Sequence, residues 1–167
     1  MDSTDLKAAQ APLKARYRED PAAALVTLRA QGALGAESVS CSVSTGRALV
    51  EAGLHPATGG TGLLACSGDM LLEALVACAG VTLRAVATSL GLDVRGTVYA
   101  EGDLDFRGTL GVAKDEGVPV GFQGIRLRFD LEHSGSDEDF ERLMRLTERY
   151  CVVYQTLVGG VPVTVSY

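Results

Sequence analysis

Residues 69–90 read DMLLEALVACAGVTLRAVATSL, and this stretch decides the fold of the chain. Nearly all of these residues favour helices, and after Asp69 only Glu73 and Arg84 carry charge. A helix that is apolar on every side has to be buried on every side. We therefore predict a central buried helix here, with Ser67 or Asp69 capping its start and Gly91 ending it.

The residues before this helix predict an antiparallel meander. Three short runs of alternating or apolar residues, at 25–30, 38–43 and 47–52, are typical of strands and are separated by glycines. The loop at 55–62 then leads into the helix. Residues 4–18 are more polar and predict a separate helix, so we expect an N-terminal helical extension over 1–23 and one domain over 24–167.

The residues after the helix predict two strands, a second helix and a last strand. The strands are expected at 93–101 and 124–132, joined by a glycine-rich connection at 106–121. Ser136 and Asp139 resemble a capping box and open an amphipathic helix whose apolar stripe continues to Cys151. Residues 162–167 are expected to form a short closing strand. The fold class is thus α+β, with antiparallel sheets around a buried helix.

The composition favours a soluble single domain. The chain has 167 residues, of which 47% are hydrophobic, and this length is enough for one core. A helix that is apolar all round is hard to cover in such a chain, so we expect a second subunit, in a homodimer.

The net charge and the lack of long apolar stretches limit the expected partners and the expected location of the protein. The net charge of −6 disfavours nucleic acid and anionic membranes. No stretch is expected to span a membrane, and no secretory signal is recognised, which favours the cytoplasm. No cofactor is expected.

The four cysteines are the main candidates for chemistry: Cys41, Cys66, Cys78 and Cys151. Structural disulfides are disfavoured because a cytosolic compartment keeps thiols reduced. The spacing contains no CxxC, and only two histidines accompany the cysteines, so a zinc site is also disfavoured. If the cysteines do chemistry, thiol redox chemistry is the expected kind. The spacing of Cys78 and Cys151 alone does not decide between this chemistry and core packing, since a free cysteine also acts as a small buried hydrophobic residue.

Redox chemistry at Cys78 sets chemical requirements on its surroundings. The thiolate is the nucleophile, and an apolar site raises the pKa of a thiol unless a cation or a hydrogen-bond donor opposes it. An arginine is the natural partner, oriented by a carboxylate. A second cysteine within reach would condense with the sulfenic acid to form a disulfide.

Two segments resemble the motifs of the OsmC/Ohr family. Residues 69–78, an acidic residue followed by an apolar run and Ala-Cys, are similar to its central-helix motif, and residues 148–157 are similar to the motif of its second cysteine. The resemblance covers about residues 24–167. It implies an intertwined homodimer that reduces organic hydroperoxides, with Cys78 peroxidatic and Cys151 resolving. It also implies a dithiol reductant, in some members a lipoylated protein.

Three positions depart from the family pattern. The Asn-Pro-Glu triplet is replaced by residues 67–69, where Asp69 is left as the candidate for orienting an arginine. The proline after the second cysteine is replaced by Val152. The turn that carries the family's arginine has none, which leaves Arg29 and Arg47 as candidates. Two alternatives to a peroxidase follow: a protein that binds a hydrophobic ligand in the dimer cleft, and a stress-associated dimer without chemistry.

Overall fold

The structure, a computed structural model, describes residues 31–34, 40–44, 49–111 and 117–167, with single positions at 2, 4, 8, 11 and 19. The chain forms two compact units, one of residues 27–73 and 100–127 and the other of residues 1–26, 74–99 and 128–167. The predicted boundary between 1–23 and 24–167 lies outside the described residues and stays a prediction.

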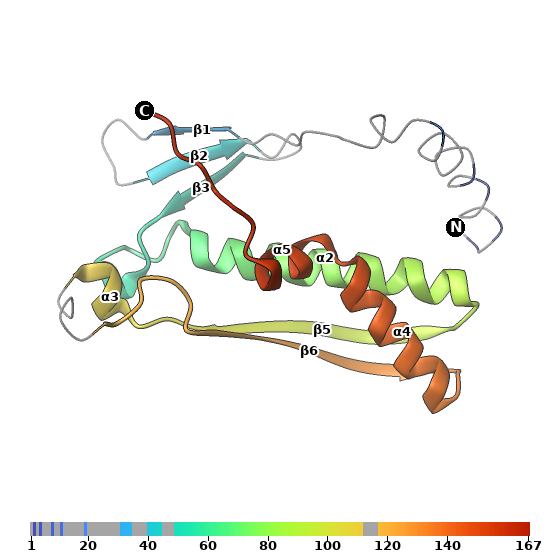
Figure 1. The fold of residues 1–167 in the computed structure, drawn as a ribbon. Helices are drawn as coiled ribbons and strands as arrows, with labels where there is room; N and C mark the ends of the chain where they lie inside the picture. The colour runs from blue at the N-terminus through green and yellow to red at the C-terminus, as the bar shows by residue number, and fades with distance from the viewer. Residues whose placement is uncertain are drawn as a thin grey trace. The chain divides into compact units, whose positions relative to one another are not determined.

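The unit of residues 27–73 and 100–127 contains the predicted meander (Figure 1). Its sheet has the order β1-β2-β3-β4, antiparallel except for the parallel pair β3/β4. The bounds are β1 Gln31–Leu34, β2 Ser40–Ser44, β3 Leu49–Gly53 and β4 Ala65–Cys66. The predicted strand at 25–30 lies outside the described residues, and β1 lies in the glycine-containing stretch that was expected to separate two strands. The backbone of β1 pairs with that of β2 from Gln31–Ser44 to Leu34–Cys41. Pairing with a neighbouring strand therefore stabilises an extended conformation here in spite of Gly32, which locally favours a turn.

Two short helices complete this unit. The 3-10 helix η2, Pro56–Thr58, and the helix α3, Phe106–Leu110, are joined by the His55 and Phe106 rings, which stack with their centroids 4.7 Å apart. We expected no regular structure between residues 106 and 121, and α3 corrects this. Asp105 caps it by accepting the Arg107 N–H, and Gly111 ends it in the left-handed region, so local capping suffices for one turn.

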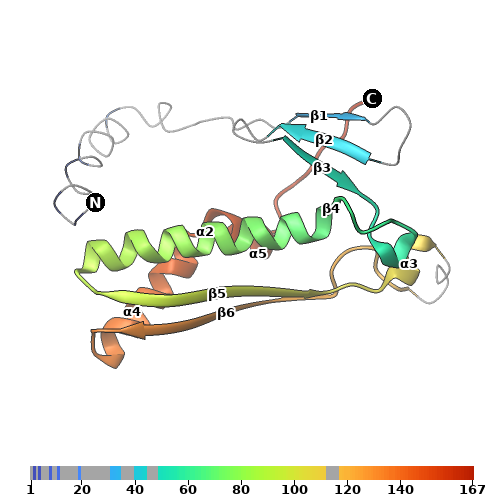
Figure 2. The same ribbon diagram turned by 180° about the vertical axis from the view of Figure 1, so that it is seen from behind.

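The other unit is built on the predicted central helix. This helix, α2, runs from Ser67 to Leu90, and from residue 74 onward it belongs to this unit. It ends as predicted at Gly91, where the N–H of Leu92 reaches the carbonyl of Ala87. The strands β5, Val94–Asp103, and β6, Gly124–His133, run beside it as an antiparallel pair (Figures 1 and 2). As predicted, β6 keeps its charged residues exposed and its apolar residues partly buried.

The single chain buries α2 along one stripe only, so the expected burial on every side, which includes a second subunit, stays a prediction. One stripe at every fourth residue is buried, whereas Val81 is 72% exposed. The stripe consists of Leu75, Ala79, Leu83 and Ala87. By length and composition alone α2 is also apolar enough to cross a membrane, which corrects the expectation that no stretch is. Core helices of soluble proteins pass the same test, so this observation decides little.

The buried stripe of α2 packs against the next helix along the chain. This helix, α4, spans Asp137–Tyr150, and Leu143 on α4 is fully buried with Leu83 and Ala87. Ser136 and Asp139 form the capping box that the sequence indicated. A last helix, α5, follows at Val152–Gly159 (Figure 1). The predicted closing strand at 162–167 is wrong: the segment has no strand pairing among the described residues, and all of it is exposed.

Candidate active site

Cys78 lies in the middle of α2, next to the buried stripe. Its neighbours along the helix are the buried Leu75 and Ala79, and its own side chain is half-buried. Residues three and four positions apart share one helix face. Thr82 is four residues after Cys78, and its hydroxyl is one of the groups that lower the pKa of the Cys78 thiol.

Cys151 lies where α4 ends and α5 begins. On α4 the buried residues Leu143 and Thr147 are spaced by four, and Cys151 continues this spacing with only 1% of its surface exposed. Its N–H donates to the Thr147 carbonyl at 3.0 Å. Its backbone is extended, with φ −73° and ψ 106°, and this conformation ends one helix and starts the next. The predicted apolar stripe of α4 thus places Cys151 among the buried residues.

The start of α5 brings the two thiols together. The first helical hydrogen bond of α5 runs from the Gln155 N–H to the Cys151 carbonyl at 2.9 Å. The preceding N–H groups, those of Val152, Val153 and Tyr154, have no partner within the helix. The N–H groups of Val152 and Val153 lower the pKa of the Cys78 thiol, those of Val153 and Tyr154 lower the pKa of the Cys151 thiol, and each thiol shifts the pKa of the other. Both cysteines are free in the structure.

The surroundings of Cys78 favour its thiolate. Burial raises the pKa of the Cys78 thiol, but hydrogen bonds outweigh burial and lower its pKa below the ordinary value. The donors are, in order of effect, the Val153 N–H, the Cys151 thiol, the Val152 N–H and the Thr82 hydroxyl.

The surroundings of Cys151 act in the opposite direction. Burial raises the pKa of the Cys151 thiol, and interaction with Cys78 raises it further, although the N–H groups of Tyr154 and Val153 oppose both effects. Cys151 is the N-cap residue of α5, but its side chain does not accept a capping hydrogen bond from the backbone N–H groups of that helix. Of the two thiols, Cys78 is therefore the one whose pKa is shifted toward the thiolate form.

The other candidates for this site are not brought to Cys78. Asp69 is exposed and precedes Cys78 by nine residues on one helix, which is about two and a half turns. Its role in the first turn of α2 is consistent with a favourable charge at a helix N-terminus. Arg29 and Arg47 lie outside the described residues, so their roles stay predictions. Among the described residues, the groups that shift the pKa of Cys78 include no arginine.

Sequence reasoning missed three contributors to this site. Thr82 was detectable, because a hydroxyl four residues after a helical cysteine shares its face. Val152 and Val153 contribute backbone N–H groups, and these depend on where α5 begins. Nothing in their side chains signals this role.

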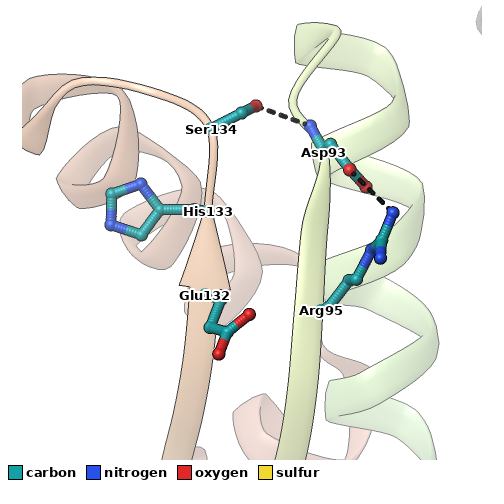
Figure 3. Close-up of a pocket in the computed structure, with 5 residues that line it drawn as sticks. All are labelled: Asp93, Arg95, Glu132, His133 and Ser134. Carbon is teal, nitrogen blue, oxygen red and sulfur yellow. Dashed lines mark hydrogen bonds and ion pairs between the residues drawn. The ribbon is translucent and has the colours of Figure 1, made fainter.

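Two pockets among the described residues are lined by neither Cys78 nor Cys151. One of about 250 Å³ lies where β5 starts and β6 ends, with Asp93 and Arg95 paired at 3.4 Å (Figure 3). Figure 3 shows His133 turned away from these two residues, and its ring stacks on Phe140. Another, of about 340 Å³, contains Cys66, His55 and Asp69. Within the described part of the chain, no three potential ligands form a metal cluster.

The sequence profile of the OsmC-like protein family matches residues 60–166. The chain belongs to this family. The matched region contains both α2 with Cys78 and the α4–α5 junction with Cys151. The sequence resemblance to OsmC/Ohr proteins is thereby confirmed. No functionally curated protein matches the sequence of this OsmC-like protein.

Solved structures of OsmC-like proteins share the fold. An OsmC-like protein from Mycoplasma pneumoniae has a TM-score of 0.64 at 16% identity, over 80% of this chain and 89% of that one. An organic hydroperoxide resistance protein from Elizabethkingia anophelis has a TM-score of 0.58 at 17% identity, over 81% and 90%. Another organic hydroperoxide resistance protein, from Legionella pneumophila, has a TM-score of 0.56 at 19% identity, over 84% of this chain and 95% of that one. The predicted α+β OsmC/Ohr fold is therefore confirmed. At sequence identities of 16–19%, these structures establish a shared fold and not a shared activity.

Proposed function

We propose that this OsmC-like protein is a thiol peroxidase that reduces organic hydroperoxides, with Cys78 peroxidatic and Cys151 resolving. The observation that carries the proposal is the asymmetric thiol pair at the start of α5. Cys78 is half-buried and has a lowered pKa, whereas Cys151 is buried and has a raised pKa, and each thiol is among the groups that shift the pKa of the other. A two-cysteine peroxidase needs this division between an attacking thiolate and a resolving thiol.

The proposed reaction balances over three steps. The Cys78 thiolate attacks the distal oxygen of ROOH, the O–O bond breaks, and the alkoxide takes a proton to leave as ROH. Cys78 is then a sulfenic acid. The Cys151 thiol condenses with it, forming the disulfide and releasing water. An external dithiol reduces this disulfide by thiol–disulfide exchange and is itself oxidised to a disulfide.

A steady-state assay tests this function. Cumene hydroperoxide is supplied with dihydrolipoamide as the dithiol or with glutathione as the monothiol. We expect catalytic consumption with dihydrolipoamide, because a dithiol resolves its own mixed disulfide, and much slower consumption with glutathione. Consumption no faster than that without protein, with either thiol, would contradict the peroxidase and favour a ligand-binding OsmC-like protein.

We also infer that two copies of the chain associate. The single chain covers only one stripe of α2 and leaves Leu71 and Val81 exposed, together with the apolar side chains of the C-terminal segment. Exposed apolar surface of this extent is typical of interaction sites. Light scattering is expected to give about twice the chain mass of 17.4 kDa. A mass of one chain at micromolar concentration would contradict the homodimer.

A further inference from the structure

We propose that a pocket between α2 and the β5–β6 pair binds an amphipathic carboxylate, with the carboxylate group on Arg84 and the hydrocarbon tail on an apolar floor. The pocket has a volume of about 650 Å³, within the range of small-molecule sites. Its described lining residues all belong to the unit built on α2, and neither Cys78 nor Cys151 is among them. The inference therefore does not depend on the proposed peroxidase.

The floor of the pocket is apolar. Leu83 on α2 and Val94 on β5 are buried, and Val98 and Leu131 are partly buried beside them. A hydrocarbon tail gains free energy when it leaves water for such a surface, and each buried methylene group strengthens binding by up to about fourfold. The floor therefore fits the apolar part of a ligand.

Arg84 supplies a cation at the edge of this floor. Its Nη1 donates to the Val94 carbonyl at 2.7 Å, which ties the side chain of a helix residue to the neighbouring strand. Among the described residues, no acceptor binds its Nε or Nη2, and no carboxylate forms an ion pair with it. Nε and Nη2 are parallel donors that match the two oxygens of a carboxylate. Because Arg84 is already held at Val94, little side-chain freedom is lost on binding.

The other charged groups of the pocket leave the charge of Arg84 uncompensated. Asp93 is the one carboxylate among the described lining residues, and it pairs with Arg95 at 3.4 Å (Figure 3). This lining thus has two cations and one anion, although the whole chain has a net charge of −6. One negative charge on the ligand balances the pocket, so the charges favour a monocarboxylate.

Gly80 leaves space for a ligand between α2 and β5. It lies in the interior of α2, where glycine is less favourable than alanine. Its φ is not positive, and among the described atoms a Cβ at this position would meet nothing nearer than a methyl carbon of Val98, at 4.0 Å. Neither the backbone nor the packing of the described chain therefore requires a glycine. Its effect is to keep this side of the pocket open.

Calorimetric titration of the wild-type protein with octanoate near neutral pH tests the inference. Octanoate has both charge and tail, 1-octanol has the tail without the charge, and propionate has the charge with almost no tail. We expect octanoate to bind at one site per chain at submillimolar concentration. Octanol is expected to bind at least about tenfold more weakly, as for the loss of a charge-assisted hydrogen bond, and propionate not to bind at the same concentrations. No heat of binding at millimolar octanoate, or equal affinities for octanoate and octanol, would overturn the inference.

Arg84→Gln assigns the carboxylate contact. Glutamine lacks the charge but keeps an amide that can donate to a carbonyl. We expect this variant to bind octanoate at least about tenfold more weakly and octanol as the wild type does. Arg145→Gln is the matched control, because it removes the same charge from an exposed arginine on α4 that pairs with Glu141 and does not line the pocket. Equal affinities of the two variants for octanoate would overturn the assignment to Arg84.

Gly80→Leu tests the space in the pocket. Leucine favours a helix more than glycine does, so α2 is retained while the side chain occupies the pocket. Gly80→Ala is the control, since there is room for its Cβ. We expect octanoate binding to be lost in Gly80→Leu and kept in Gly80→Ala. Should Gly80→Leu fail to fold, the Arg84 and Arg145 variants still decide the question.

Light scattering on the same variants distinguishes the ligand from another occupant, a second copy of the chain. We expect Gly80→Leu to have the same mass in solution as the wild type. If Gly80→Leu falls to the mass of one chain while Arg84→Gln binds octanoate as the wild type does, the pocket belongs to an interface between copies and the inference is overturned.

Discussion

Cys78→Ser is expected to reduce hydroperoxide consumption to the rate of the uncatalysed reaction, because a serine hydroxyl is not ionised near neutral pH and does not attack the O–O bond. Cys151→Ser is expected to behave differently. Its Cys78 still attacks, so one equivalent of cumene hydroperoxide is consumed per chain in the absence of reductant. No thiol then resolves the product, and a sulfenic acid persists at Cys78.

Mass spectrometry after treatment with dimedone distinguishes the two variants. Dimedone labels sulfenic acids, so we expect label at Cys78 in Cys151→Ser and none in Cys78→Ser. Cys66→Ser is the control, since the structure describes Cys66 in a separate pocket, beside His55 and Asp69. It should retain wild-type consumption. Equal, undiminished consumption by Cys78→Ser and Cys151→Ser would refute the assignment of both cysteines.

Leu143→Ala is expected to lower the free energy of unfolding by about 2–5 kcal/mol, as is typical of a leucine removed from a packed core. Leu143 has no exposed surface and packs with Leu83 and Ala87, through which α4 is fixed on α2. Urea denaturation measures the change as a shift of the midpoint at constant slope. Leu63→Ala is the control, because Leu63 is 87% exposed and its loss should cost little. Equal midpoints for both variants would contradict the described core.

The strongest local patterns in the sequence predicted the elements that carry the site. The run of helix formers over residues 69–90 and the terminating Gly91 gave α2 almost to the residue. Ser136 and Asp139 gave the start of α4, and its apolar stripe led to the buried Cys151. These signals are local, so a single sequence is enough to detect them.

Features that depend on distant partners were predicted less well. An apolar helix indicates burial but does not say which chain covers it, and here one chain covers one stripe of α2. The alternating residues 162–167 suit a strand, yet a strand needs an edge to pair with. Elements held by one turn of local capping, such as α3, were missed because single-turn signals are weak.

The thiol pair illustrates the same limit at the site. The separation of 73 positions between Cys78 and Cys151 does not show that the two thiols interact, and only the resemblance to OsmC/Ohr motifs predicted that they do. Their opposite pKa shifts follow from the start of α5 at Val152, where the sequence motif only indicated a segment before a final strand. Backbone donors of this kind carry no side-chain signature.

The most direct test of the central claim is a count of free thiols in the wild-type protein before and after one equivalent of cumene hydroperoxide, with peptide mapping of any disulfide. The account predicts that two thiols per chain are lost rapidly and that one disulfide joins Cys78 to Cys151. An unchanged thiol count, or a disulfide that involves Cys41 or Cys66 in place of this pair, would contradict it.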